Sequence, residues 1–209
     1  MNIVSEPIEY TSLRTIWSAH SSGFVDHGHH AAFRIESYRR AGGYDESFTH
    51  NEDAELDCRQ RALGSRIYLD AGIRLSYHPR DSLRGLWRQY LGYGRGRART
   101  VRRHRGSMRL RQLAVPAHVA WTVMALALFA WLPLLMLWPA LYAGVLAAVS
   151  VSLSLRKRSL CGLLAGPLAA VMHTAWAFGF FWSFISVRER RWTATEAAPW
   201  TKTSAVSKA

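Results

Sequence analysis

The stretch best suited to proton transfer is acidic and runs from Thr49 to Arg59. Asn51 is a candidate N-cap and Gly64 a helix stop, so Glu52 and Asp53 fall in the first turn of a short helix. A carboxylate fixed there could accept a proton from a hydroxyl group that attacks an electrophile, provided substrate binding excludes water. First-turn acids also complement the helix dipole, so this pattern alone does not decide for catalysis.

The sequence on both sides of this helix resembles the acceptor half of the family 2 glycosyltransferases. The resemblance covers nearly all of residues 23 to 103, and the runs that carry it are 32–34, 38–48 and 51–56. The runs 25–31 and 88–97 are similar in particular to the membrane-bound enzymes of succinoglycan-type exopolysaccharide synthesis. The resemblance implies part of a GT-A domain, the α/β fold of the nucleotide-diphospho-sugar transferases.

The resemblance also assigns roles within the acidic helix. It implies that Asp53 is the general base of an inverting sugar transfer, and that Glu52 and Asn51 orient this base or the acceptor. Glu55 and Asp57 lie further along the helix, and we expect them to be ordinary surface charges.

A second motif points to the acceptor. In the related cellulose-synthase-like enzymes, a Gln-x-x-Arg-Trp motif on an interfacial helix helps to hold the acceptor at the membrane. Gln89 matches the Gln, and Tyr93 stands where the Trp would be. Gly92 replaces the Arg, so Arg95 or Arg97 would have to supply the positive charge. Plain packing at the membrane surface is an equally good interpretation of Gln89 and Tyr93.

The donor side is poorly represented. Members of the family hold the nucleotide and a divalent cation, magnesium or manganese, through an Asp-x-Asp motif in an amino-terminal half. No Asp-x-Asp occurs in the 209 residues, so the ligands of a hard cation are mostly missing and no metal ligand is assigned. His29, His30 and His78 are candidate contacts to the donor, although a structural role is the better-supported interpretation. We therefore expect a carboxy-terminal portion of such an enzyme, which would be inactive without a donor-binding half.

The charge pattern favours a membrane surface over a nucleic acid. Lys and Arg number 27 against 14 acidic residues, a net charge of +13. Eleven arginines lie between Arg80 and Arg111 with a single acid, Asp81, and this run adjoins a long apolar region. Arginines in that position suit phospholipid head groups, and no nucleic-acid-binding motif accompanies them. The two cysteines, Cys58 and Cys161, do not suggest a disulfide framework.

The elements around the acidic helix are short. Residues 1 to 22 show no period and are interpreted as a connection. We expect an extended segment over 23–33, a helix over 35–41 that Gly42 and Gly43 end, and strands over 66–70 and 73–77. Asp81 or Ser82 would cap an amphipathic helix with one arginine face, suited to a bilayer surface.

The carboxy-terminal half reads as membrane helices. No charge occurs from 113 to 155, which predicts spans at 113–132 and 135–155, and the positive-inside rule puts Arg156–Arg158 in the cytoplasm. A third apolar region, 160–187, ends in further arginines. Either it breaks near Pro167 and forms a re-entrant or double pass, or it violates the rule. Within it, His173 is a functional candidate, with a helix–helix hydrogen bond the favoured use.

These predictions combine into α/β structure plus transmembrane helices. The expected domains are a partial GT-A domain (1–112), a membrane region of about three spans (113–187) and a disordered tail (188–209). The expected protein lies in the inner membrane as a multi-pass chain with a cytoplasmic catalytic part, since no cleavable signal is visible. It would transfer sugar from a nucleotide-diphospho-sugar to a lipid-linked or polysaccharide acceptor. The alternative is a non-catalytic basic membrane module that binds anionic lipid or polysaccharide.

Overall fold

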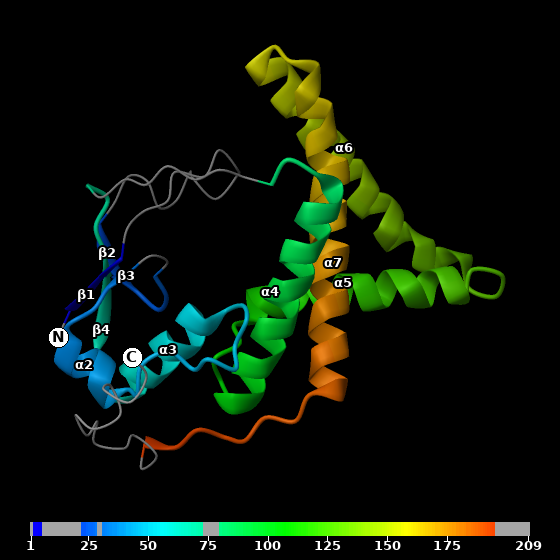
Figure 1. The fold of residues 1–209 in the computed structure, drawn as a ribbon. Helices are drawn as coiled ribbons and strands as arrows, with labels where there is room; N and C mark the ends of the chain where they lie inside the picture. Colours follow the sequence, from blue (N-terminus) through cyan, green and yellow to red (C-terminus); the bar gives the residue numbers. More distant parts are fainter. Residues whose placement is uncertain (1, 6–21, 29–30, 73–79, 195–209) are drawn as a thin grey trace. The chain divides into compact units, whose positions relative to one another are not determined.

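The computed structural model describes residues 2–5, 22–28, 31–72 and 80–194. The chain divides into two compact units, each described here by itself (Figure 1). Unit 1 comprises residues 1–79, 102–107 and 189–209, and unit 2 comprises residues 80–101 and 108–188. Three separate stretches of sequence therefore build unit 1.

A small mixed sheet forms one part of unit 1. Its strands are β1 (Asn2–Ser5), β2 (Gly23–Val25), β3 (Ala31–Ala32) and β4 (Arg66–Leu69), in the order β2-β4-β1-β3. β1 pairs parallel with β4, while β2–β4 and β1–β3 are antiparallel. The expectation that residues 1 to 22 only connect is wrong for β1, because a four-residue strand is too short to show a period. The second predicted strand, 73–77, lies outside the described residues.

Two helices of unit 1 follow the predicted pattern. α2 (Ile35–Arg40) ends at Ala41, and both Gly42 and Gly43 adopt positive φ, at 83° and 71°. These left-handed conformations suit glycine, which explains the stop. α3 (Glu52–Ala62) ends at Leu63 and Gly64, the latter at φ 86°. Leu56 on α3 and Ile67 on β4 are fully buried, and α3 contacts β4.

Unit 2 is helical. It contains most of α4 (Leu83–Arg103), then α5 (Leu110–Ala127), the 3-10 turn η1 (Pro133–Met136), α6 (Leu137–Lys157), the 3-10 turn η2 (Leu160–Leu164) and α7 (Ala165–Ser186). Asp81 and Ser82 were the two predicted caps of α4. The structure supports Ser82, because its Oγ accepts a hydrogen bond from the Gly85 N–H at 3.2 Å.

α4 and α7 pack backbone against backbone. A Cβ atom at Gly94 would lie 2.0 Å from the carbonyl oxygen of Trp176, and one at Gly179 would lie 2.1 Å from that of Leu91. Small residues that let helices approach so closely are typical of helix pairs in membranes. The glycines of α4 are therefore packing residues, although glycine is otherwise unfavourable inside a helix.

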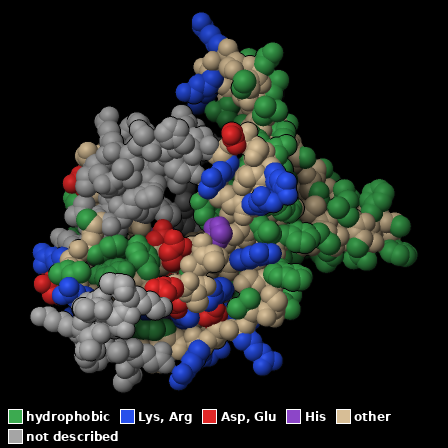
Figure 2. Space-filling view, in the orientation of Figure 1, with side chains coloured by type: hydrophobic (Ala, Val, Ile, Leu, Met, Phe, Trp, Pro, Cys, Tyr) green, Lys and Arg blue, Asp and Glu red, His purple; other side chains and the backbone are tan. Residues whose placement is uncertain are grey.

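Two described helical segments are long and apolar enough to cross a membrane, Pro133–Lys157 and Leu160–Ser186. Large apolar side chains are exposed along them and along α5, and Figure 2 shows this hydrophobic surface on the helices of unit 2. The first predicted span, 113–132, corresponds to α5, which ends earlier, at Ala127. α7 runs unbroken through Pro167, because this proline stands in the first turn, where its missing N–H has no helical partner; the chain changes direction at η2 instead.

The observed fold is thus mostly helical, with a small sheet and two candidate membrane helices. The α/β part of the expectation is present in unit 1. Its assignment to the GT-A fold stays a prediction.

Candidate functional site

The first turn of α3 presents the predicted catalytic carboxylates. Asn51 is the N-cap residue, as predicted, but it adopts the left-handed conformation (φ 66°) and its side chain makes no capping hydrogen bond. Glu52 and Asp53 follow in the first turn, and all three are half-buried. The backbone, and not the Asn51 side chain, therefore sets the direction of this turn.

Asp53 combines a fixed position with access to solvent. Its Oδ1 accepts the N–H of Ala54 at 2.7 Å, and its Oδ2 lies 3.8 Å from Nε2 of His27. The side chain is 26% exposed, which leaves room for a substrate hydroxyl to approach.

His27 is itself anchored by a buried acid. Asp57 Oδ2 lies 2.6 Å from Nδ1 of His27 and accepts the backbone N–H of Gly28 at 3.0 Å. The Asp57 side chain is 2% exposed, so the expectation of a surface charge is wrong. Asp57 and Asp53 stand one helical turn apart on the same face of α3, and His27 lies between their carboxylates. Motifs alone do not identify His27 as part of this site, because its partners lie 26 and 30 positions away.

An aromatic cluster adjoins the two carboxylates. The rings of Phe33, Tyr38 and Tyr44 lie 5.6 to 6.1 Å apart, and the Tyr38 hydroxyl accepts the N–H of Tyr44 at 3.1 Å. Partial burial, together with the negative charges of Asp53 and Asp57, raises the pKa of Tyr44 to about 12. The phenol therefore stays protonated at neutral pH and is available as a hydrogen-bond donor beside the carboxylates.

Glu55 is the centre of a second, buried network. It is fully buried, which also contradicts the expected surface charge. Its carboxylate accepts a bidentate pair of hydrogen bonds from Arg59 at 2.7 to 3.0 Å and lies 2.9 Å from Nε2 of His104. Burial would raise the pKa of Glu55, but the hydrogen bonds from His104 and Arg59 lower it overall.

Arg103 extends this network across unit 1. It pairs with Asp45 at 2.5 Å, with Glu55 at 3.5 Å and with Glu189 at 3.1 Å. Although burial opposes the charged form of Arg103, its three carboxylate partners raise its pKa. The pKa of Asp45 is held well below its ordinary range, because the hydrogen bonds from Arg103 and Ser47 outweigh partial burial. The network ties the segments 102–107 and 189–192 to α3.

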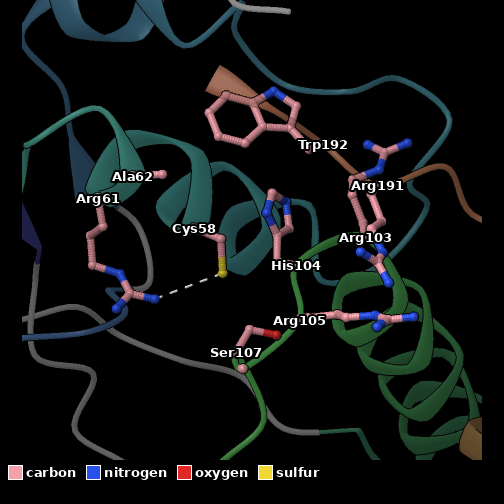
Figure 3. A pocket seen from close by; sticks show the side chains of 10 residues that line it. Cys58, Arg61, Ala62, Arg103, His104, Arg105, Ser107, Arg191 and Trp192 are labelled. Carbon is pink, nitrogen blue, oxygen red and sulfur yellow. Dashed lines mark hydrogen bonds between the residues drawn. The ribbon is translucent and has the colours of Figure 1, made fainter. Parts of the chain in front are cut away.

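A basic pocket of about 450 Å³ opens next to this network (Figure 3). Its charged and aromatic lining comes from α3 and from the two segments tied to it, and includes Arg61, Arg103, His104, Arg105, Arg191 and Trp192. None of its ten lining residues is acidic. The predicted basic run contained Arg103 and Arg105 but not Arg61 or Arg191, and the sequence did not predict a pocket.

The other predicted site residues fall elsewhere. Gln89 donates a 2.7 Å hydrogen bond to the Tyr93 hydroxyl, one turn apart on α4 in unit 2. Arg95 is exposed, whereas Arg97 donates to Gln112 at 2.7 Å, so Arg95 is the better candidate for the charge that Gly92 lacks. His29, His30 and His78 lie outside the described residues.

A divalent cation finds no ligand set in the part of the chain that the structure describes. No group of three or more His, Cys, Asp or Glu side chains there is arranged to hold a metal ion. The carboxylates nearest to one another around His27 are occupied with that imidazole.

Comparison with curated proteins relates the chain to proteins of succinoglycan-type exopolysaccharide biosynthesis, and this confirms the resemblance that its motifs predict. The relative is the succinoglycan biosynthesis protein ExoA of Rhizobium meliloti (strain 1021), which is 41% identical over 179 residues. The match covers 83% of this chain and 53% of that protein, so the chain spans about half the length of the relative it matches. No family model and no solved structure matches the chain.

Proposed function

We propose that the chain is the acceptor-facing part of a membrane-bound, inverting glycosyltransferase of exopolysaccharide assembly, with Asp53 as general base. The observation that carries the proposal is the position of Asp53, fixed in the first turn of α3, accessible to solvent and backed by the Asp57-anchored imidazole of His27. The similarity to a succinoglycan biosynthesis protein supports the same activity class.

In the proposed reaction, Asp53 removes the proton from an acceptor hydroxyl as its oxygen attacks the anomeric carbon of the donor sugar. The bond between that carbon and the diphosphate breaks, and the nucleoside diphosphate leaves with the bonding electrons. His27 keeps Asp53 directed towards the acceptor, and the Tyr44 hydroxyl can donate a hydrogen bond nearby. A base positioned in this way typically contributes a factor of about 10² to 10⁴ to the rate.

The proposed substrates are a nucleotide-diphospho-sugar and a lipid-linked or polysaccharide acceptor. Gln89, Tyr93 and the exposed Arg95 on α4 are proposed to bind the acceptor, and Glu52 and Asn51 to orient it. The family's magnesium or manganese ion would be held by residues other than the described ones, together with most of the donor contacts.

Membrane binding is proposed to use an even number of crossings. The N–H of Trp192 donates to the carbonyl oxygen of Arg103 at 3.2 Å, and Glu189 pairs with Arg103, so the segments that flank residues 108–188 belong to one unit. A compact unit lies on one side of a bilayer. The chain must then return to the side from which it left.

We place the two crossings at α5 and α6. α7 is long and apolar enough to cross, but its carboxy-terminal half packs against α4, which carries seven arginines. Arginines are costly in the hydrocarbon region, so this half of α7 belongs near the head groups. The apolar part of α5, Gln112–Ala127, spans about 24 Å, and the apolar residues 128–132 extend it towards the hydrocarbon thickness. This arrangement puts Arg156–Arg158 on the side of unit 1, as the positive-inside rule requires.

The non-catalytic alternative is supported by a different observation, the basic pocket of unit 1. A module that only holds an anionic lipid or polysaccharide needs the pocket and the apolar helices but does not need Asp53.

Transfer assays distinguish the two functions. Membranes that contain the chain joined to a donor-binding half are incubated with labelled nucleotide-diphospho-sugars, and label is measured in the lipid and polysaccharide fractions. We expect transfer that falls at least about 100-fold in Asp53→Asn, while the matched variant Glu46→Gln, an exposed acid, retains it. Equal transfer by Asp53→Asn would remove Asp53 from the role of base. Absence of transfer by a chain that still binds membranes would favour the non-catalytic module.

A further inference from the structure

The basic pocket of unit 1 contains positive charge that no ion pair within the described residues neutralises. Arg103 is committed to Asp45, Glu55 and Glu189, as described above. Arg105 and Arg191, in contrast, line the pocket, are exposed, and form no ion pair within the described residues. The pocket therefore offers at least two guanidinium groups to a ligand.

Arg61 adds a donor that lacks a partner. Its Nη1 lies 3.4 Å from Asp26, in a half-exposed pair, and its Nη2 contacts the Cys58 sulfur at 3.7 Å. Its buried Nε–H has no hydrogen-bond partner among the residues that the structure describes. A buried donor without a partner is destabilising, and a bound acceptor group would satisfy it.

The pocket residues lie close in sequence to the apolar helices. Ser107 at the pocket precedes the start of α5 by three residues, and Arg191 follows the end of α7 by five. Five residues reach at most roughly 18 Å. The half-buried Trp192, whose ring centre lies 5.7 Å from that of His104, adds an aromatic side chain of the kind found at bilayer surfaces.

From these observations we infer that the pocket binds a phosphate or diphosphate group through Arg61, Arg105 and Arg191. Guanidinium groups suit such a ligand because their fork of N–H donors matches two phosphate oxygens at once. The volume of about 450 Å³ accommodates a diphosphate and part of the group attached to it. The group could be carried by a lipid or by a soluble molecule, and the binding site is independent of whether Asp53 transfers sugar.

Binding measurements on the full chain test this site. The detergent-solubilised chain is titrated with inorganic pyrophosphate, and the chain in lipid discs is mixed with vesicles that contain a long-chain isoprenyl diphosphate. We expect the double variant Arg105→Gln/Arg191→Gln to lose at least about tenfold in affinity, because each charge-assisted hydrogen bond contributes more than a neutral one. The matched variant Arg156→Gln/Arg158→Gln removes the same charge from the loop after α6 and should bind as the original chain does.

Each outcome of these measurements supports or overturns the proposed phosphate site. Arginine-dependent binding of both probes supports a lipid-borne diphosphate, and binding of pyrophosphate alone supports a soluble one. No binding of either probe, or equal losses in the two double variants, overturns the site. The variant Arg105→Lys/Arg191→Lys keeps the charge and removes the guanidinium fork, so it shows whether binding needs the paired N–H donors. Circular dichroism checks that each variant is folded. Asp53→Asn should bind both probes normally, so a failure of this inference is distinct from a failure of the proposed transfer reaction.

Discussion

The imidazole of His27 is anchored to the buried carboxylate of Asp57 through a 2.6 Å contact. Replacing Asp57 by Ala would leave both this ring and the N–H of Gly28 without their acceptor. We expect the free energy of unfolding to fall by about 1 to 3 kcal/mol, measured by chemical denaturation in detergent. The matched variant Asp26→Ala removes a half-exposed partner of Arg61 and should cost less than about 1 kcal/mol. Equal effects would mean that the Asp57 anchor adds no stability.

Tyr44 reports on the charge of Asp53 without any activity assay. Its pKa is raised to about 12 by burial and then by the carboxylates, so Asp53→Asn should lower it, whereas Glu46→Gln should not. The measurement is the tyrosinate absorbance between pH 9 and 13, with Tyr44→Phe as the reference spectrum. Between the ordinary value of 10 and about 12, only the unfolded chain loses this proton, so stability falls as pH rises through that window. An unchanged Tyr44 titration in Asp53→Asn would place the two groups further apart.

The Glu55 network should make unit 1 acid-sensitive. The pKa values of Glu55 and Asp45 are lowered in the folded protein, so both stabilise it above their ordinary values of 4.5 and 3.8. This stability is lost as pH falls below those values. Glu55→Gln, which leaves the buried Arg59 without its carboxylate, should lower the free energy of unfolding by about 3 to 5 kcal/mol at pH 7 and flatten the acid dependence. A steep acid transition that survives in both Glu55→Gln and Asp45→Asn would assign it to other groups.

The α4–α7 contact tolerates no side chain at two positions. Gly94→Ala would place a Cβ atom 2.0 Å from a backbone oxygen of α7, so the helices must separate. We expect a loss of about 1 to 3 kcal/mol, seen as a lower thermal midpoint in detergent. Gly144→Ala on α6, where no atom lies within 4 Å of the added Cβ, is the control and should be neutral or slightly stabilising. Similar midpoints for both variants would show that α4 and α7 are not packed in this way.

Labelling of single cysteines tests the proposed even number of crossings. Cys58 and Cys161 are first replaced by Ser, and one cysteine is then introduced at Ser47, Ala130, Ser159 or Arg191. A membrane-impermeant thiol reagent should label Ser47→Cys and Ser159→Cys from the same side, and Ala130→Cys from the other. If Ala130→Cys shares the side of Ser47→Cys, the crossings are α6 and α7 instead. If residues 47 and 191 are labelled from opposite sides, the count is odd.

Local signals predicted the helices of unit 1 well. Gly42, Gly43 and Gly64 could be predicted as helix ends because such an end depends on the local backbone conformation alone. The observed positive φ angles agree. The position of Asp53 in the first turn followed from the same kind of signal. The apolar segments were likewise found from composition, which is a property of each stretch by itself.

Contacts between residues far apart in the sequence could not be predicted from such local signals. Glu55 and Asp57 look like surface charges on a short helix, and they are buried because Arg103, His104 and His27 reach them from 30 to 49 positions away. β1 was missed for a related reason, since its strand character depends on pairing with β4, more than 60 positions along the chain. Burial of a charge cannot be inferred until the residue that compensates it is placed.

The ion pair of Arg103 with Glu189 gives biosynthesis of this protein a fixed order. A ribosome releases α3 early, but Arg103 gains its last counter-charge only after all the intervening apolar helices have been made. The surroundings of α3 are therefore completed late in synthesis. A chain that stalls before residue 189 would leave Arg103 without this partner, so the network around Glu55 is complete only when nearly the whole chain has been made.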